Sequence, residues 1–156
     1  MNVLIIDDEP RDLRFIIDSL HEQWCFCLLV STPEEARKLF SESDTLPDAV
    51  ILDIMMPEAN PRAEDPEGHA TGVQLIEPLV HYYRRIAGAN ARGYLTQHLP
   101  VAILTKLTDI EILSALDKKT AATDGIRCKR WPKTVKPSVF AAEFLEFVKA
   151  KMGDGA

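Results

Sequence analysis

Short apolar runs alternate with amphipathic stretches five times along this chain of 156 residues. The first run, VLII at residues 3–6, is of the kind that is buried on both faces of a parallel sheet. The stretches between the runs carry apolar residues at helical spacing, which predicts crossover helices that cover the sheet. The alternation therefore predicts an α/β sandwich of three layers around a five-stranded parallel sheet.

The boundaries of these elements follow from capping and turn residues. Thr32 and Pro33, for example, provide a capping hydroxyl and an early proline for the second helix, and Pro10 suits the first turn of the first helix. Strands are expected at 3–6, 25–30, 49–53, 101–104 and, more weakly, 126–131, and helices from about 10 to 20, 33–40, 73 to about 87, 109 to about 119 and 138–151.

The length suits a single domain over residues 1–151, followed by a flexible tail at 152–156. Two segments are longer than such a domain requires, a loop insertion at about 58–71 and an extended third helix and loop at about 73–99. The first contains prolines and acidic residues, which indicates either a solvated loop or a lid that contacts a partner. The second contains tyrosines and arginines, which fit either a long helix with a solvated face or a protein-contact surface.

Charge and cysteine usage limit the partners and the cellular compartment that we expect for the protein. A net charge of −6 argues against binding to a nucleic acid backbone, which requires clustered Lys and Arg. Cys25, Cys27 and Cys128 are odd in number and form no CxxC pair, and no apolar span of membrane length occurs. We therefore expect a cytoplasmic protein with reduced thiols and no membrane partner.

Polar residues stand where several apolar runs end. Asp7 and Asp8 follow the first run, Asp53 follows the third, Thr105 closes the fourth and Lys133 follows the fifth. Taken singly, each has an ordinary explanation as a turn, a cap or a solvated charge. In a parallel sheet, however, the carboxyl ends of the strands meet at one edge, where ligands bind. Carboxylates gathered there predict a cation site with one carboxylate left to react.

In order and position, these residues resemble the receiver domains of two-component response regulators, which have a flavodoxin-like (βα)5 fold. The segments VLIIDDEP and PDAVILDIMMP, with Thr105 and Lys133, carry the resemblance. It implies that Asp53 accepts a phosphoryl group and that Thr105 and Lys133 bind phosphoryl oxygens. It also implies that Asp8, Asp53 and the main-chain carbonyl of Met55 hold Mg²⁺, with Asp7 acting through water. The implied partners are a histidine kinase or phosphotransfer protein and an unknown downstream protein, and pairing of two copies stays open.

The chain departs from the family pattern near the expected site. Lys136 precedes a proline, as the family lysine usually does, so it competes with Lys133 for the role of active-site lysine. Arg130 stands where many members carry a switch aromatic; either the adjacent Trp131 takes that role or the chain has no aromatic switch. Lys106 replaces a small residue, and a long cation there would either restrict access to the site or attract the donor.

Three functions are compatible with this pattern. We expect a stand-alone phosphoacceptor rather than an enzyme, with at most self-catalysed phosphorylation and dephosphorylation. The first alternative is a receiver-like binding module with little phosphoryl turnover. The second is a phosphoaspartate-type hydrolase, which would need an acid or base two positions after the nucleophile, where this chain has Met55.

Overall fold

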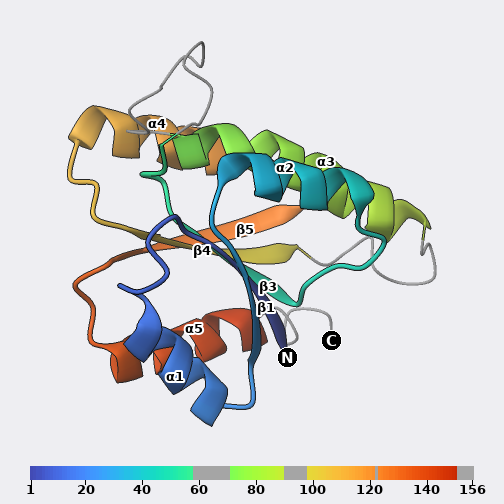
Figure 1. Ribbon diagram of the computed structural model, residues 1–156. Coiled ribbons are helices and arrows are strands. Elements are labelled where there is room, and N and C mark those ends of the chain that lie inside the picture. Colours follow the sequence, from blue (N-terminus) through green and yellow to red (C-terminus); the bar gives the residue numbers. More distant parts are fainter. Residues whose placement is uncertain (58–70, 90–97, 122, 151–156) are drawn as a thin grey trace.

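The structure is a computed structural model that describes residues 1–57, 71–89, 98–121 and 123–150. Strands and helices alternate throughout these residues (Figure 1). In chain order the elements are β1 (Asn2–Ile6), α1 (Arg14–Glu22), β2 (Phe26–Val30), α2 (Pro33–Glu42), β3 (Ala49–Leu52), α3 (Thr71–Ala89), β4 (Leu99–Thr105), α4 (Ile110–Ala121), β5 (Ile126–Pro132) and α5 (Pro137–Lys149).

The five strands form one parallel sheet in the order β2-β1-β3-β4-β5. Helices α1 and α5 cover one face of this sheet, and α2, α3 and α4 cover the other (Figure 1). The predicted flavodoxin-like sandwich with its five-stranded parallel sheet is therefore confirmed. In the register, Ile6 of β1 stands beside both Val30 and Leu52, so β1 and β3 end level with each other.

The core has two halves, one on each face of the sheet. Alternate residues of β1 point to opposite faces, because successive side chains of a strand do so. Leu4 and Ile6 pack with α2, α3 and α4, whereas Val3 and Ile5 pack with α1 and α5. All four residues of β3 are buried. The central strands are thus fixed from both faces, which holds their carboxyl ends in place.

Some element boundaries differ from the sequence expectation. The first helix begins at Arg14 and not near Pro10, because Pro10 to Leu13 form tight turns in which Asp12 and Leu13 donate to the carbonyls three residues earlier. Strand β4 begins at Leu99 and includes Pro100. The proline is tolerated because pairing with β3 starts one residue later, at Val101.

The tyrosines and arginines of α3 mostly serve the fold. Tyr82 is buried, stacks on Phe40 with 5.4 Å between ring centroids, and donates its hydroxyl to the carbonyl of Thr45. Arg85 donates to the carbonyls of Phe40 and Ser43 at the end of α2. These contacts favour the extended-helix interpretation for this part of the cluster. Arg92, Tyr94, the tail and all but the last residue of the predicted insertion at about 58–71 lie outside the described residues, and Thr71 begins α3.

The three cysteines are free thiols. Cys25 is buried, while Cys27 and Cys128 are half-buried against the two halves of the core. Burial raises the pKa of the Cys27 thiol to about 11 and that of Cys128 to about 12. Thiols with such values stay protonated at neutral pH and are poor nucleophiles.

No helix among the described residues is both long and apolar enough to span a membrane.

Replacing Thr32 by alanine is expected to cost about 1 kcal/mol of unfolding free energy. The Thr32 hydroxyl accepts the Glu35 N–H at 3.1 Å, and the Glu35 carboxylate in turn accepts the Ser31 N–H, so the first turn of α2 is capped from both sides. Urea unfolding followed by circular dichroism measures the change. Ser41→Ala in the same helix is the control and should stay within about 0.5 kcal/mol, because that hydroxyl only bonds back to Lys38.

Candidate functional site

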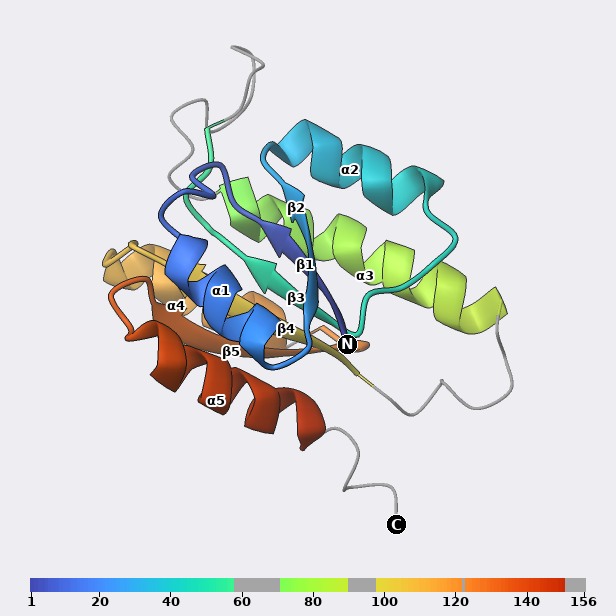
Figure 2. The ribbon, with the colours of Figure 1, turned by 60° about the horizontal axis from the view of Figure 1, so that its bottom comes forward.

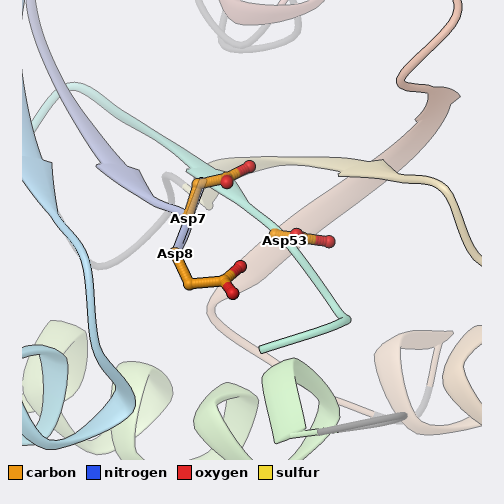
Figure 3. A group of neighbouring side chains, drawn as sticks. All are labelled: Asp7, Asp8 and Asp53. Carbon is orange, nitrogen blue, oxygen red and sulfur yellow. The ribbon is translucent and has the colours of Figure 1, made fainter. Parts of the chain in front are cut away.

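Two buried carboxylates stand directly after β1 and β3. The sheet ladder continues for one residue beyond each strand, since Asp7 donates its N–H to the Val30 carbonyl and Asp53 donates its N–H to the Ile6 carbonyl. Asp8 follows on the next position and is half-buried. Carboxylate oxygens of these three residues lie within 4.8 Å of one another, and Figure 3 shows the Asp8 side chain turned toward Asp53. The register of β1 and β3 thus assembles the acidic cluster.

Lys133 completes this cluster from the first residue after β5. Its Nζ lies 2.7 Å from Oδ2 of Asp53 and 2.7 Å from Oδ2 of Asp7, and its side chain is only 4% exposed. Its backbone N–H donates to the carbonyl of Thr105, which ties it to the end of β4. Lys136 instead precedes the first turn of α5 and is exposed. The structure therefore brings Lys133, and not Lys136, to the carboxylates.

Burial and charge act against each other on these groups. Burial raises the pKa of Asp7 above its ordinary value, although the hydrogen bond and charge of Lys133 oppose the shift. Burial also raises the pKa of Asp8, and the charge of Asp7 adds to it. Burial alone would lower the pKa of Lys133, but its hydrogen bonds to Asp53 and Asp7 raise it overall. Three carboxylates around one ammonium leave excess negative charge in the site.

Some oxygen positions of the cluster are already satisfied and others are not. Asp7 Oδ1 accepts the Glu9 N–H at 2.8 Å, and Asp53 Oδ1 accepts the Met55 N–H at 3.0 Å. Asp7 Oδ2 is buried and lies 2.7 Å from the Lys133 ammonium, which Asp53 Oδ2 shares. Three carboxylates grouped around one shared ammonium suit a hard cation such as Mg²⁺, which takes oxygen ligands and keeps several waters.

Two adjoining cavities give access to the cluster. A small one of about 170 Å³ is lined by Asp8, Asp53, Met55 and Lys133, together with Glu9, Pro57 and Lys106. A larger groove of about 570 Å³ runs between α4 and β5 and shares Lys106 and Lys133 with it. Thr105 lines this groove and is buried, with its hydroxyl oxygen accepting the Leu107 N–H at 3.1 Å. Thr105 and Lys133 thus stand between the acidic cavity and the groove.

A charged bridge includes two of the residues that line the small cavity, Glu9 and Lys106. Lys106 Nζ lies 3.1 Å from Glu9 and 2.5 Å from Asp12, which joins the segment after β4 to the segment after β1. These two hydrogen bonds raise the pKa of Lys106, and the same contact lowers that of Asp12. Sequence reasoning singled out Lys106 but missed both acidic partners. The one signal for Glu9 was its place beside Asp8, and nothing in the sequence marked Asp12.

Arg130, at the expected switch position, and its neighbour Trp131 have different surroundings at the end of β5. Arg130 lines the groove and lies 3.4 Å from Asp117 of α4. Trp131 is buried against α5, where its indole N–H donates to Glu143 at 2.7 Å and its ring meets Phe140 edge-on. A tryptophan held in this way is poorly placed to swing between two positions. The charged Arg130–Asp117 contact is exposed, in contrast to the buried Trp131.

Solved structures of receiver domains share this fold over nearly the whole chain. A response regulator receiver domain protein (CheY-like) from Methanospirillum hungatei gives a TM-score of 0.64 at 16% identity, covering 99% of this chain and 98% of that one. The signal receiver domain of a signal transduction histidine kinase from Syntrophus aciditrophicus gives 0.61 at 21% identity, covering 99% and 93%. No protein-family model and no curated protein matches the sequence. The chain therefore has the fold of response regulator receiver domains.

Proposed function

We propose that this chain is a receiver that accepts a phosphoryl group on Asp53 with the help of Mg²⁺ and signals through protein contacts. The observation that carries the proposal is the buried group in which the Lys133 ammonium lies 2.7 Å from both Asp53 and Asp7, with Asp8 beside them. A carboxylate, a cation-binding pair and an ammonium are the groups that phosphoryl transfer to an aspartate requires.

In the proposed reaction, an oxygen of Asp53 attacks the phosphorus atom of the donor. A new O–P bond forms, and the bond from phosphorus to the leaving group breaks, with the electron pair going to that group. The Lys133 ammonium would then bind a phosphoryl oxygen, and the Thr105 hydroxyl would donate to another. Both residues line the groove between α4 and β5, so these contacts would reach the surface that a partner reads.

The residues present fit Mg²⁺. Asp8, Asp53 and the main-chain carbonyl of Met55 would hold the cation directly, and Asp7 would act through a water molecule. When bound, the cation would offset the repulsion between the Asp53 carboxylate and the negative charge of the donor. A histidine kinase or a phosphotransfer protein is the proposed donor, and the proposed output is a contact with another protein at the groove.

Intact-mass measurement tests the proposal directly. Wild-type protein incubated with acetyl phosphate and Mg²⁺ is expected to gain the mass of one phosphoryl group, and Asp53→Asn is expected to gain none because the attacking oxygen is lost. Asp18→Asn, which changes an exposed carboxylate of α1, is the matched control and should label like wild type. Omission of Mg²⁺, with a chelator present, should suppress labelling.

The bridge formed by Lys106, Glu9 and Asp12 supports a second candidate, a receiver-like module that binds partners with little phosphoryl turnover. It narrows the approach to Asp53, since Glu9 and Lys106 both line the small cavity. Unlabelled wild type, under conditions that label an established receiver, would contradict the phosphoacceptor and favour this module. Continuous phosphate release would instead indicate a hydrolase, which Met55 disfavours because its side chain is neither an acid nor a base.

A further inference from the structure

The two edges of the sheet are protected very differently. Figure 2 shows β2 and β5 at opposite edges. Strand β5 carries Arg127, Lys129, Arg130 and Pro132, and charges and proline of this kind discourage further strand pairing. Strand β2 has the sequence FCLLV, with no charge and no proline. Among the described residues, no strand pairs with its outer side. Edge β2 is therefore open to another strand.

The side chains along β2 are unusually exposed for their type. Phe26 is 70% exposed and Leu28 is 56% exposed, and both line an apolar groove of about 450 Å³ with Leu39 and Tyr82. Leu29, which points to the opposite face, is 40% exposed. Contiguous apolar surface of this kind marks interaction sites on soluble proteins. The open edge is thus apolar on both of its faces.

Trp24 stands just before this strand and has a backbone conformation that is unfavourable for a residue with a Cβ atom. Its φ of 59° is left-handed, and the bonds from Trp24 N–H to the His21 carbonyl and from Cys25 N–H to the Leu20 carbonyl form the turn that ends α1. Glycine is the usual residue at this position of the turn. The side chain is 84% exposed, so packing within the chain does not compensate for the strained backbone. Trp is, however, a frequent anchor of protein interfaces.

The hydrogen bonds of β2 show which groups face outward. Phe26 N–H donates to the Met1 carbonyl and the Val30 carbonyl accepts from Asp7, so Phe26 and Val30 direct their backbone groups toward β1. Because this direction alternates along a strand, Leu28 does the same, while Cys27 and Leu29 present their N–H and C=O groups to the open side. Both outward residues are symmetric about Leu28.

We propose that β2 pairs with β2 of a second copy of this chain, antiparallel and centred on Leu28. In this register Cys27 of each copy lies opposite Leu29 of the other, so their outward N–H and C=O groups form four hydrogen bonds. The two Leu28 side chains meet at the two-fold axis, and Phe26 lies beside Val30 of the other copy. Trp24 extends the contact toward the start of the partner's α2.

A second copy suits this edge for two reasons. No residue from Trp24 to Val30 is charged. Two molecules that each carry a net charge of −6 can therefore meet along this strand without placing like charges opposite each other. A two-fold pair also closes on itself, which is the commonest form of soluble oligomer. The contact is confined to one short strand and Trp24, so the dimer is expected to be weak and concentration-dependent. The proposal does not depend on phosphoryl transfer.

Sedimentation velocity across a concentration series tests the dimer. Leu28→Glu puts two like charges opposite each other at the axis and is expected to raise the dimer Kd by about 30-fold or more. Ile110→Glu changes a residue of α4 that is 82% exposed and should leave the Kd unchanged. A wild type that stays monomeric over the whole series, or equal effects of both variants, overturns the proposal.

Trp24→Gly separates the interface from the fold. Glycine relieves the left-handed backbone, so the Tm of the monomer should not fall, whereas the dimer Kd should rise by about 10-fold because the anchor is lost. An unchanged Kd contradicts the proposal.

Cross-linking tests the register. With Cys27 replaced by serine, Leu28→Cys should form a disulfide between copies on mild oxidation, since directly opposed non-hydrogen-bonded residues have Cα atoms about 4.5 Å apart. Leu29→Cys in the same background should not cross-link, because residues 29 of the two copies are diagonal neighbours about 7–8 Å apart. The reverse pattern, or no cross-link at position 28, contradicts a pairing centred on Leu28.

Discussion

Lys133→Met is expected to lower the unfolding free energy by about 3–5 kcal/mol at neutral pH without Mg²⁺. Methionine keeps the length of the side chain but leaves the buried carboxylates of Asp7 and Asp53 with no ammonium within reach. A loss of this size is a large part of the total stability of an ordinary domain. Equilibrium unfolding in urea, in the presence of a chelator, measures it. Lys136→Met is the control. It should change the unfolding free energy little, because Lys136 is exposed.

Two further conditions distinguish electrostatics from lost packing. Saturating Mg²⁺ should shrink the difference between Lys133→Met and wild type, because a divalent cation restores positive charge to the cluster. Lower pH should also shrink the difference. Burial raises the pKa of Asp7, so its protonation as the pH falls removes a charge that the variant leaves buried without a partner, while in wild type it weakens the ion pair with Lys133. A loss that is the same with and without Mg²⁺, and at every pH, would show that Lys133 stabilises the fold by packing alone.

Gly72→Ala is expected to destabilise the protein by about 3 kcal/mol, at the upper end of overpacking effects. A Cβ at position 72 would lie 2.1 Å from the Asp53 carbonyl oxygen and 2.6 Å from the Cα of Ile54. Both atoms belong to the backbone, so no side-chain rotation relieves the contact. Relief requires α3 to move away from the end of β3, where Gly72 N–H donates to the Ile54 carbonyl at 3.0 Å. Thermal unfolding measures the loss of stability.

Gly88→Ala in the same helix provides the opposite expectation. A Cβ at that position meets no atom within 4 Å, and alanine is the better helix former, so the variant should gain about 0.5–1 kcal/mol. A loss of stability for Gly72→Ala and a gain for Gly88→Ala would show that the loss arises from the close approach of α3 to the Asp53 backbone. A similar small change in stability for both variants would contradict this explanation.

The sequence predicted the sheet well and its surroundings less well. The order of apolar runs and helical stretches was enough to predict the fold. The positions of Asp7, Asp8, Asp53 and Lys133 at strand ends were enough to predict that they lie together, because the carboxyl ends of parallel strands share one edge of the sheet. The apolar composition of β2 predicted a strand but could not tell a central strand from an exposed edge. That distinction depends on strand order, which is set by packing across the whole chain.

The contacts of Lys106 beside the site could not have been predicted. Lys106 meets Glu9 and Asp12 across almost a hundred positions of sequence, and a flexible side chain in solvent has many carboxylates within reach. The start of α1 was misplaced for a related reason. Pro10 fits a helix start by local preference, but the segment after Asp8 must turn along the site before the helix can begin.

The basic residues of β5 set a limit on assembly. Two copies joined through β2 would form a ten-stranded sheet whose outermost strands are both β5, each carrying Arg127, Lys129 and Arg130. A third copy would find only these charged borders and no second apolar edge. The unequal edges would therefore let the protein pair while preventing the growth of filaments.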